Sequence, residues 1–133
     1  MSSRERLIRQ KRMQVTDATR KIVQIEAMIA ELEQLDSVLA RDIKIEEDRS
    51  GIRDPANFAY STYAKAARQR RENIQRSMTE LRNKLDLLRS TQAEATETLE
   101  SLYQLNDSTV RQNSGVSLRT SVAVVETPSS AAG

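Results

Sequence analysis

A seven-residue repeat of apolar residues constrains the fold of this chain more than any other feature. From Ile8 the repeat continues for more than five heptads, and nine of its twelve seam positions are apolar. One row contains Ile8, Val15, Ile22, Ile29, Asp36 and Ile43, and the other contains Lys11, Ala18, Ile25, Leu32, Leu39 and Glu46. A stripe of this length is typical of a coiled coil and not of a helix on a globular core.

The second half of the chain repeats the pattern, with eleven of fourteen seam positions apolar or Tyr. One row contains Tyr60, Ala67, Ile74, Leu81, Leu88, Ala95 and Leu102, and the other contains Ala64, Arg71, Met78, Leu85, Gln92, Leu99 and Asn106. Arg71 and Gln92 are polar breaks of the kind that fix register at some cost in stability. Beside the first seam, Met28 and Leu35 widen the apolar stripe, so a further surface can rest there.

The stretch between the two repeats predicts a chain reversal. Gly51 is placed to end the first helix, because glycine enters the left-handed conformation at little cost. Asp54 is placed to cap the second helix, and Pro55 fits its first turn, where a missing N–H costs nothing. A connection of about six residues favours antiparallel neighbours.

We therefore expect an all-α fold, an antiparallel two-helix coiled-coil hairpin with a disordered C-terminal tail. Its parts are a helix of about 3–48, a turn at 49–54, a helix of about 55–107 and the tail at 108–133. The tail is rich in Ser, Thr, Gly and Ala, a composition typical of disorder. Within it, Ser121–Val125 has the composition to add a strand to a partner's sheet edge.

The distribution of charge independently favours the antiparallel hairpin. Residues 22–48 have a net charge of −6 and residues 49–89 a net charge of +6, while 1–21 are basic and 90–107 carry four acids and no base. Folding the chain at the turn places the acidic segment against 55–82. A parallel dimer would set each charged block beside itself, which is unfavourable.

The composition argues against an enzyme. The chain has no cysteine and no histidine, so thiolate chemistry, common zinc sites and the usual catalytic triads lack their groups. There is no glycine-rich phosphate loop with its lysine. We expect no catalytic residue, cofactor, metal or small-molecule substrate. The charged start also predicts no secretory signal, and no apolar run reaches the ~20 residues of a membrane span.

Two basic clusters raise the alternative of nucleic-acid binding. The N-terminal SSRERLIRQKR resembles a basic-zipper arm, and RQRRENIQR forms a second cluster from Arg68 to Arg76. The seam already runs through Ile8 and Val15, and the overall charge is only +2. These observations argue against nucleic acid as a partner and predict only a weak attraction to a membrane surface.

Three of the four aromatic residues gather after the turn, at Phe58, Tyr60 and Tyr63. Tyr60 falls on the seam, which predicts burial at the elbow of the hairpin. Phe58 and Tyr63 fall off or beside the seam, which favours outward contact with a partner. Both interpretations, elbow packing and recognition, stay open at this point.

Several stretches resemble the FliJ family, in its alphaproteobacterial branch, the small coiled-coil component of the flagellar type III export apparatus. They are SRERLIRQKRMQV, IVQIEAMIAELE and EEDRSGIRDPANFAYSTYAKAARQRREN, and the likeness covers residues 3 to about 105. The resemblance implies a stalk that couples the hexameric export ATPase to the large membrane export-gate protein and assists export chaperones. It also implies a cytoplasmic location, peripheral to the inner membrane at the flagellar base.

Together with position along the hairpin, the resemblance assigns contact residues to each partner. The resemblance implies that the paired helix ends enter the ATPase ring and that a patch on the coil meets the gate. The ring residues would be Arg4, Arg6, Arg9, Lys11, Arg12, Leu99 and Leu102, and the gate residues Leu35, Val38, Phe58, Tyr60 and Tyr63. The rival interpretation is a generic coiled-coil tether or adaptor, for which any partner could use the same hairpin.

Overall fold

The computed structural model describes residues 2–114, with side chains to residue 112. It contains two helices, α1 (Ser3–Ser50) and α2 (Thr62–Ser114), joined by a loop at 51–61, with no strand in the described part. The all-α prediction is therefore confirmed. Helix α2 continues seven residues past 107, so the prediction that helix ends there was wrong. The remainder of the expected tail, with Ser121–Val125, lies outside the described residues.

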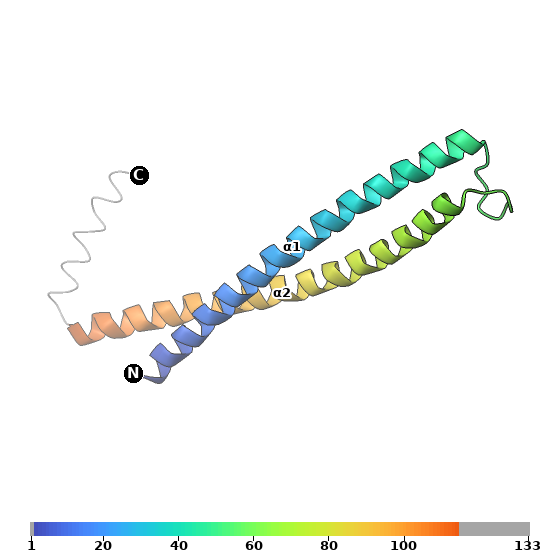
Figure 1. Cartoon of the computed structure of the whole chain (residues 1–133). Coiled ribbons are helices and arrows are strands. Elements are labelled where there is room, and N and C mark those ends of the chain that lie inside the picture. Colours follow the sequence, from blue (N-terminus) through green and yellow to red (C-terminus); the bar gives the residue numbers. More distant parts are fainter. Residues whose placement is uncertain (1, 115–133) are drawn as a thin grey trace, which may run out of the picture. The chain divides into compact units, whose positions relative to one another are not determined.

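The chain divides into two compact units. Unit 2 comprises residues 17–91 and holds the loop with the adjoining arms of both helices, whereas the described part of unit 1 combines residues 2–16 with 92–114. Within unit 2, α1 and α2 run in opposite directions from the loop (Figure 1). The predicted antiparallel hairpin is confirmed there.

The heptad seam forms the core, as the repeat predicts. Every one of the seam positions named above is buried or half-buried, including those held by polar residues. In unit 2 the largest buried cluster lies next to the loop and contains Leu39, Ile43, Tyr60, Ala64, Ala67, Ile74 and Met78. A second cluster contains Ile22, Ile29 and Leu85. Apolar burial along the seam therefore holds the two helices together in these clusters.

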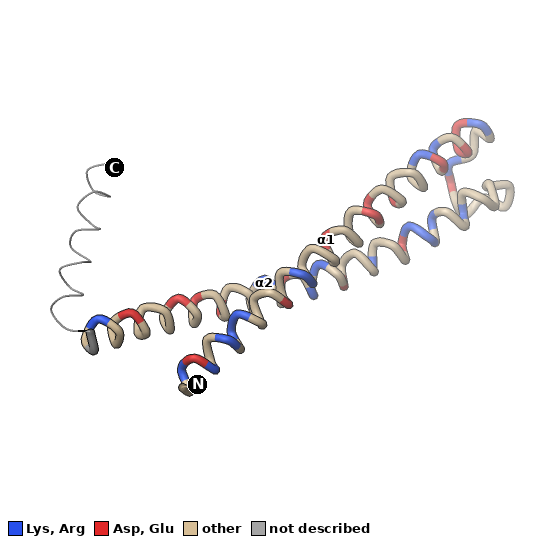
Figure 2. Tube along the Cα trace, turned by 60° about the vertical axis from the view of Figure 1, so that its left-hand side comes forward, with Lys and Arg blue, Asp and Glu red and all other residues tan. Residues whose placement is uncertain are grey.

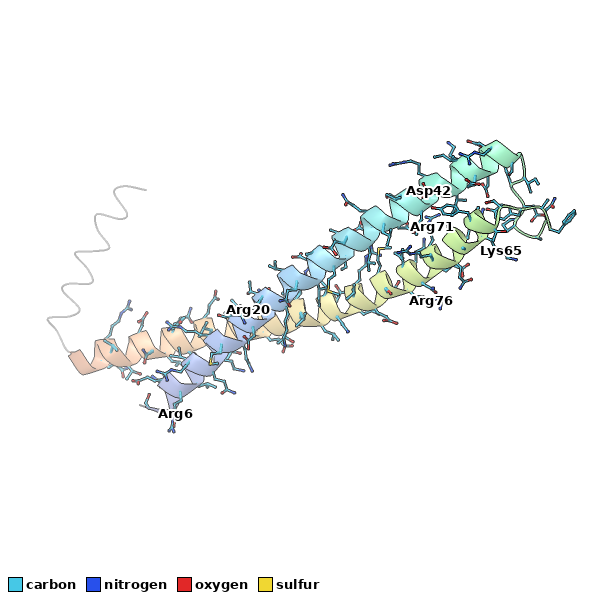
Figure 3. The ribbon with its side chains drawn as sticks, viewed as in Figure 1. Arg6, Arg20, Asp42, Lys65, Arg71 and Arg76 are labelled. Atoms are coloured by element: carbon cyan, nitrogen blue, oxygen red, sulfur yellow. The ribbon has the colours of Figure 1, made fainter. Side chains whose placement is uncertain are left out.

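The two polar seam residues Asp36 and Arg71 meet across the core. Arg71 Nε donates to Asp36 Oδ1 at 2.9 Å, and Arg71 Nη2 donates to Oδ2 at 3.2 Å. The Arg71 side chain lies between the two helices (Figure 3). These bidentate bonds lower the pKa of Asp36 below its usual value. A one-heptad slip would set each of these charges against apolar residues, so the pair fixes the register.

Ion pairs beside the seam confirm that acidic α1 faces basic α2 (Figure 2). Arg68 bonds Glu47 at 3.0 Å, and Arg89 bonds Glu26 at 3.0 Å, three heptads further along both helices. The predicted pairing of the acidic segment with 55–82 is confirmed at Arg68 and Arg71, but it also extends beyond that segment to Arg89. The loop is longer than the predicted turn, which moves the pairing along α2.

The helix ends at the loop follow the prediction on one side only. Gly51 has a φ of 75°, and its N–H donates to the Glu47 carbonyl at 2.8 Å, the left-handed cap expected of it. The assignment of Asp54 and Pro55 to the start of the second helix was wrong. Helix α2 begins at Thr62, where the Ser61 hydroxyl accepts the Ala64 N–H at 3.1 Å.

Unit 1 also pairs the two helices antiparallel. Ile8 and Ala95 are buried in it, and Ser2 caps α1 by accepting the Glu5 N–H at 3.1 Å. Two arginines bridge the helices, through Arg12 to Tyr103 and through Arg4 to Thr109. Within the described residues of this unit, these links between helices end on hydroxyls or a carbonyl, and no ion pair joins α1 to α2.

Removing one partner of the Asp36–Arg71 pair should destabilise the hairpin. We expect Arg71→Ala to lower the free energy of unfolding by about 1–2 kcal/mol, between the values for exposed and fully buried pairs. The Asp36→Leu, Arg71→Leu double variant should be at least as stable as wild type, because it extends the apolar seam. Thermal unfolding followed by circular dichroism measures both. A double variant as weak as Arg71→Ala would contradict this account.

Candidate interaction surfaces

The loop at the elbow is built from two consecutive turns of the same design. In the first, Asp54 accepts the Ala56 N–H on its side chain at 3.0 Å and the Asn57 N–H on its carbonyl at 3.0 Å. In the second, Asn57 accepts the Ala59 N–H on its side chain at 2.9 Å and the Tyr60 N–H on its carbonyl at 3.0 Å. Asp and Asn favour such turns because their side chains bond the backbone two residues on.

Tyr60 anchors the loop to both helices. It is 6% exposed, its hydroxyl donates to Glu47 Oε2 at 2.7 Å, and Arg68 Nε donates to that hydroxyl at 2.8 Å. Arg68 also bonds Glu47 directly, and its guanidinium lies 5.8 Å from the centre of the Tyr60 ring. Hydrogen bonds from Tyr60 and then Arg68 lower the pKa of the Glu47 carboxyl. The elbow interpretation of Tyr60 is therefore confirmed, and its ring is not free for a partner.

Phe58, by contrast, is fully exposed at 102%. It occupies the second position of the second turn, where the hydrogen bonds of Asn57 fix the backbone on either side of it. A rigid loop that exposes an apolar ring gives a partner a contact surface with little ordering entropy to lose. Phe58 does not pack the elbow, so the recognition interpretation is the one its placement favours.

Tyr63 lies on the first turn of α2 and is 54% exposed. Its hydroxyl donates to Asp42 Oδ2 at 2.8 Å, and this bond raises the pKa of the Tyr63 phenol. Asp42 lies one heptad after Leu35 on α1, and Val38 lies three residues after Leu35, so all three follow one stripe of the helix. Leu35 is half-buried and Val38 is 45% exposed. Of the predicted gate residues, all but Tyr60 thus retain some accessible surface, and Phe58 belongs to the loop.

The two flanks of the seam in unit 2 have different chemistry. We call the flank through Tyr63 and Asp42 the apolar side, defined by Met28, Leu35, Val38, Ile45, Tyr63 and Leu87. The opposite flank, the charged side, is defined by Glu26, Glu33, Glu47, Arg68, Arg82 and Arg89. On the charged side a hollow is lined by Glu26, Glu33, Arg82 and Arg89 together. Ion pairs therefore cover one flank of the seam, and apolar side chains are exposed along the other.

The residues predicted to enter the ATPase ring separate into a bonded group and an exposed group. Arg12 Nε donates to the Tyr103 hydroxyl at 2.6 Å and stacks 5.5 Å from the ring centre, while Arg4 bonds Thr109 at 2.9 Å. Arg6 and Arg9 are exposed and form no ion pair within the described residues. The other members belong to the seam of unit 1. They are Lys11, which also bonds Gln14, and the half-buried Leu99 and Leu102.

No protein-family model, curated protein or solved structure matches this chain. In the described part, no group of three or more His, Cys, Asp or Glu side chains is placed to hold a metal ion. Nor does either helix, over its described length, include a segment apolar enough to cross a membrane.

Sequence reasoning missed several residues of these surfaces. Glu47 and Tyr103 complete the arginine contacts, and Ile45 and Leu87 extend the apolar side. The signal for Ile45 was present, because it lies one heptad after Val38. Tyr103 follows the seam residue Leu102 and lies beside the seam, as Arg12 does on the first helix. Leu87 was harder to find, since its role depends on the register between the helices.

Truncating the two aromatic rings of the loop should have very different effects on stability. Tyr60→Ala removes a buried ring and should lower the free energy of unfolding by about 3 kcal/mol, as large-to-small core changes do. Phe58→Ala should change it by less than about 0.5 kcal/mol, because the ring touches solvent. Urea denaturation measures both. Equal losses in the two variants would show that Phe58 packs against the elbow.

The Asp36–Arg71 pair also predicts a pH dependence. Because the folded pKa of Asp36 is depressed, its contribution to stability is present above the unfolded pKa of ~3.9 and disappears as pH falls through the folded value. The stability difference between wild type and Asp36→Asn should therefore be largest above about pH 5 and shrink below pH 4. Urea denaturation across pH 2.5–7 (roughly the carboxylate titration range) measures it. The exposed Glu80→Gln is the control, and a difference constant with pH would contradict the assignment.

Proposed function

We propose that this chain is a non-enzymatic component of the flagellar type III protein export apparatus. In this role it is a coiled-coil stalk that couples a hexameric export ATPase to the membrane export gate and assists export chaperones. The observation that carries the proposal is the elbow. The block GIRDPANFAYSTYAKAARQRREN, which bears the most specific resemblance to FliJ, forms a double turn that exposes Phe58 and then the start of α2, where Tyr63 is 54% exposed.

Unit 1 supports the ATPase end of this proposal. Arg6 and Arg9 present guanidinium groups to solvent without carboxylate partners among the described residues, while Arg4 and Arg12 tie α1 to α2. A pair of helices that are bonded to each other but keep free charge outside suits insertion in a ring, because long-range attraction is retained while the helices stay together. Hydrolysis would belong to the ATPase.

The elbow and the adjoining apolar side support the gate contact. Phe58, Tyr63 and Val38 offer accessible apolar surface, and Tyr60 holds the loop that presents Phe58. In this proposal Tyr60 is a positioning residue and makes no gate contact itself. The protein would work at the cytoplasmic face of the inner membrane, held there through its partners.

A pull-down of tagged protein from the source cell's extract, read by mass spectrometry, tests the proposal. We expect the export ATPase and the gate protein among the captured proteins, with one copy of this chain per six ATPase chains. Phe58→Ala with Tyr63→Ala should lose the gate at unchanged helicity, whereas Arg6→Glu with Arg9→Glu should lose the ATPase. Capture of nucleic acid, or of an unrelated scaffold in place of both proteins, would overturn the proposal.

A further inference from the structure

The exposed apolar side chains of unit 2 are not scattered. Its large exposed hydrophobic residues are Val23, Met28, Val38, Ile45, Phe58, Tyr63 and Leu87. Five of the seven belong to the apolar side, while Phe58 lies in the loop and Val23 lies toward the charged side. Single exposed apolar residues are normal, but a row of them along one flank marks an interaction surface.

One end of the apolar side is hollowed into an open groove. Ile25, Met28, Leu87 and Leu88 form its apolar floor, with Gln24 beside them, and Lys21 and Lys84 line it from the two helices. Neither lysine forms an ion pair within the part of the chain that the structure describes. Two positive charges therefore border an exposed apolar surface. A partner with apolar and acidic groups would cover this surface and neutralise the charges.

The other end of the apolar side has that chemistry. Val38 and Ile45 stand exposed at 45% and 46%, with the carboxylate of Asp42 between them on the same stripe. The groove and this Val38–Ile45 ridge lie on the same flank of the same compact unit, separated by Leu35. Because the groove and the ridge lie at different ends of one flank, the ridge cannot reach the groove of its own chain. It can fill the groove of a second copy.

We propose that the apolar side is a self-association surface on which two copies pair antiparallel about a two-fold axis midway between Met28 and Val38. Each copy then sets its Val38–Ile45 ridge against the groove of the other, the isologous arrangement of a two-fold dimer. Antiparallel pairing brings Lys21 and Lys84 toward the end that carries Asp42. Parallel pairing would instead place the four lysines of the two copies together, which opposes association.

The size of the surface is compatible with a dimer. From Lys21 to Ile45 the flank is about 36 Å long at 1.5 Å per residue, and two helices are roughly 20 Å wide. Full contact would cover roughly 700 Å² per copy, close to the ~800 Å² of a standard stable interface. The charged side has no comparable apolar surface and stays exposed. The inference goes beyond the proposed export function and does not depend on it, because it concerns the purified chain alone.

Sedimentation equilibrium of the full chain tests the dimer. Wild type should be dimeric at about 100 µM and dissociate on dilution, and Leu87→Glu should weaken association by at least about tenfold. Val23→Glu is the matched control, since Val23 is 60% exposed and Leu87 70% on opposite flanks. It should associate as wild type does. A monomeric wild type at that concentration, or equal loss in both variants, would overturn the proposal.

Cross-linking tests the direction of pairing, and the absence of native cysteine makes it clean. A mixture of Met28→Cys and Val38→Cys chains should form mixed disulfide dimers in preference to either homodimer. Disulfides need Cα atoms within about 7 Å, and residues ten apart on a helix are separated by about 15 Å, so antiparallel pairing keeps the two identical cysteines of a homodimer too far apart to bond. Predominant Met28→Cys homodimers would show parallel pairing and overturn the antiparallel arrangement.

Discussion

The bidentate bond between Arg71 and Asp36 sets the register on which the other contacts of unit 2 depend. Apolar seams tolerate a slip of one heptad, because Leu, Ile and Ala replace one another at similar positions. A charge in the seam does not, since a slip would leave it buried without a partner. With this pair in place, Glu47 meets Arg68 and Glu26 meets Arg89, and Tyr63 comes within reach of Asp42.

That register also decides the geometry of the elbow. Glu47 is in place to receive both Tyr60 and Arg68, so the end of α1 and the start of α2 share a closed set of three hydrogen bonds. The loop between them then has fixed ends, and its two turns bond internally through Asp54 and Asn57. Two nearby aromatic residues thus have different roles: Tyr60 packs the elbow, and Phe58 is exposed for contact with a partner.

The heptad repeat was sufficient to predict the two helices and the buried positions, because burial in a coiled coil follows the period directly. The antiparallel pairing was predicted from the short connection and the distribution of charge. The loop was not predictable to the same degree. Asp54 and Pro55 satisfy the rules for a helix start, yet the Asn57 turn and the Ser61 cap follow them and prevail. The flanks of the seam depend on register, which the loop length shifts, so Leu87 could be assigned a side only from the structure.

The charged side and the apolar side of unit 2 offer different surfaces to a partner. A molecule that approaches the charged side meets carboxylates and guanidinium groups already paired with one another and gains little by displacing them. One that approaches the apolar side covers Met28, Val38 and Leu87, which have only water to lose. The chemistry of a partner therefore decides which side of unit 2 it contacts, and the side decides which residues it can touch. Two partners that both need the apolar face would exclude each other by occupancy alone, with no change in the conformation of the hairpin.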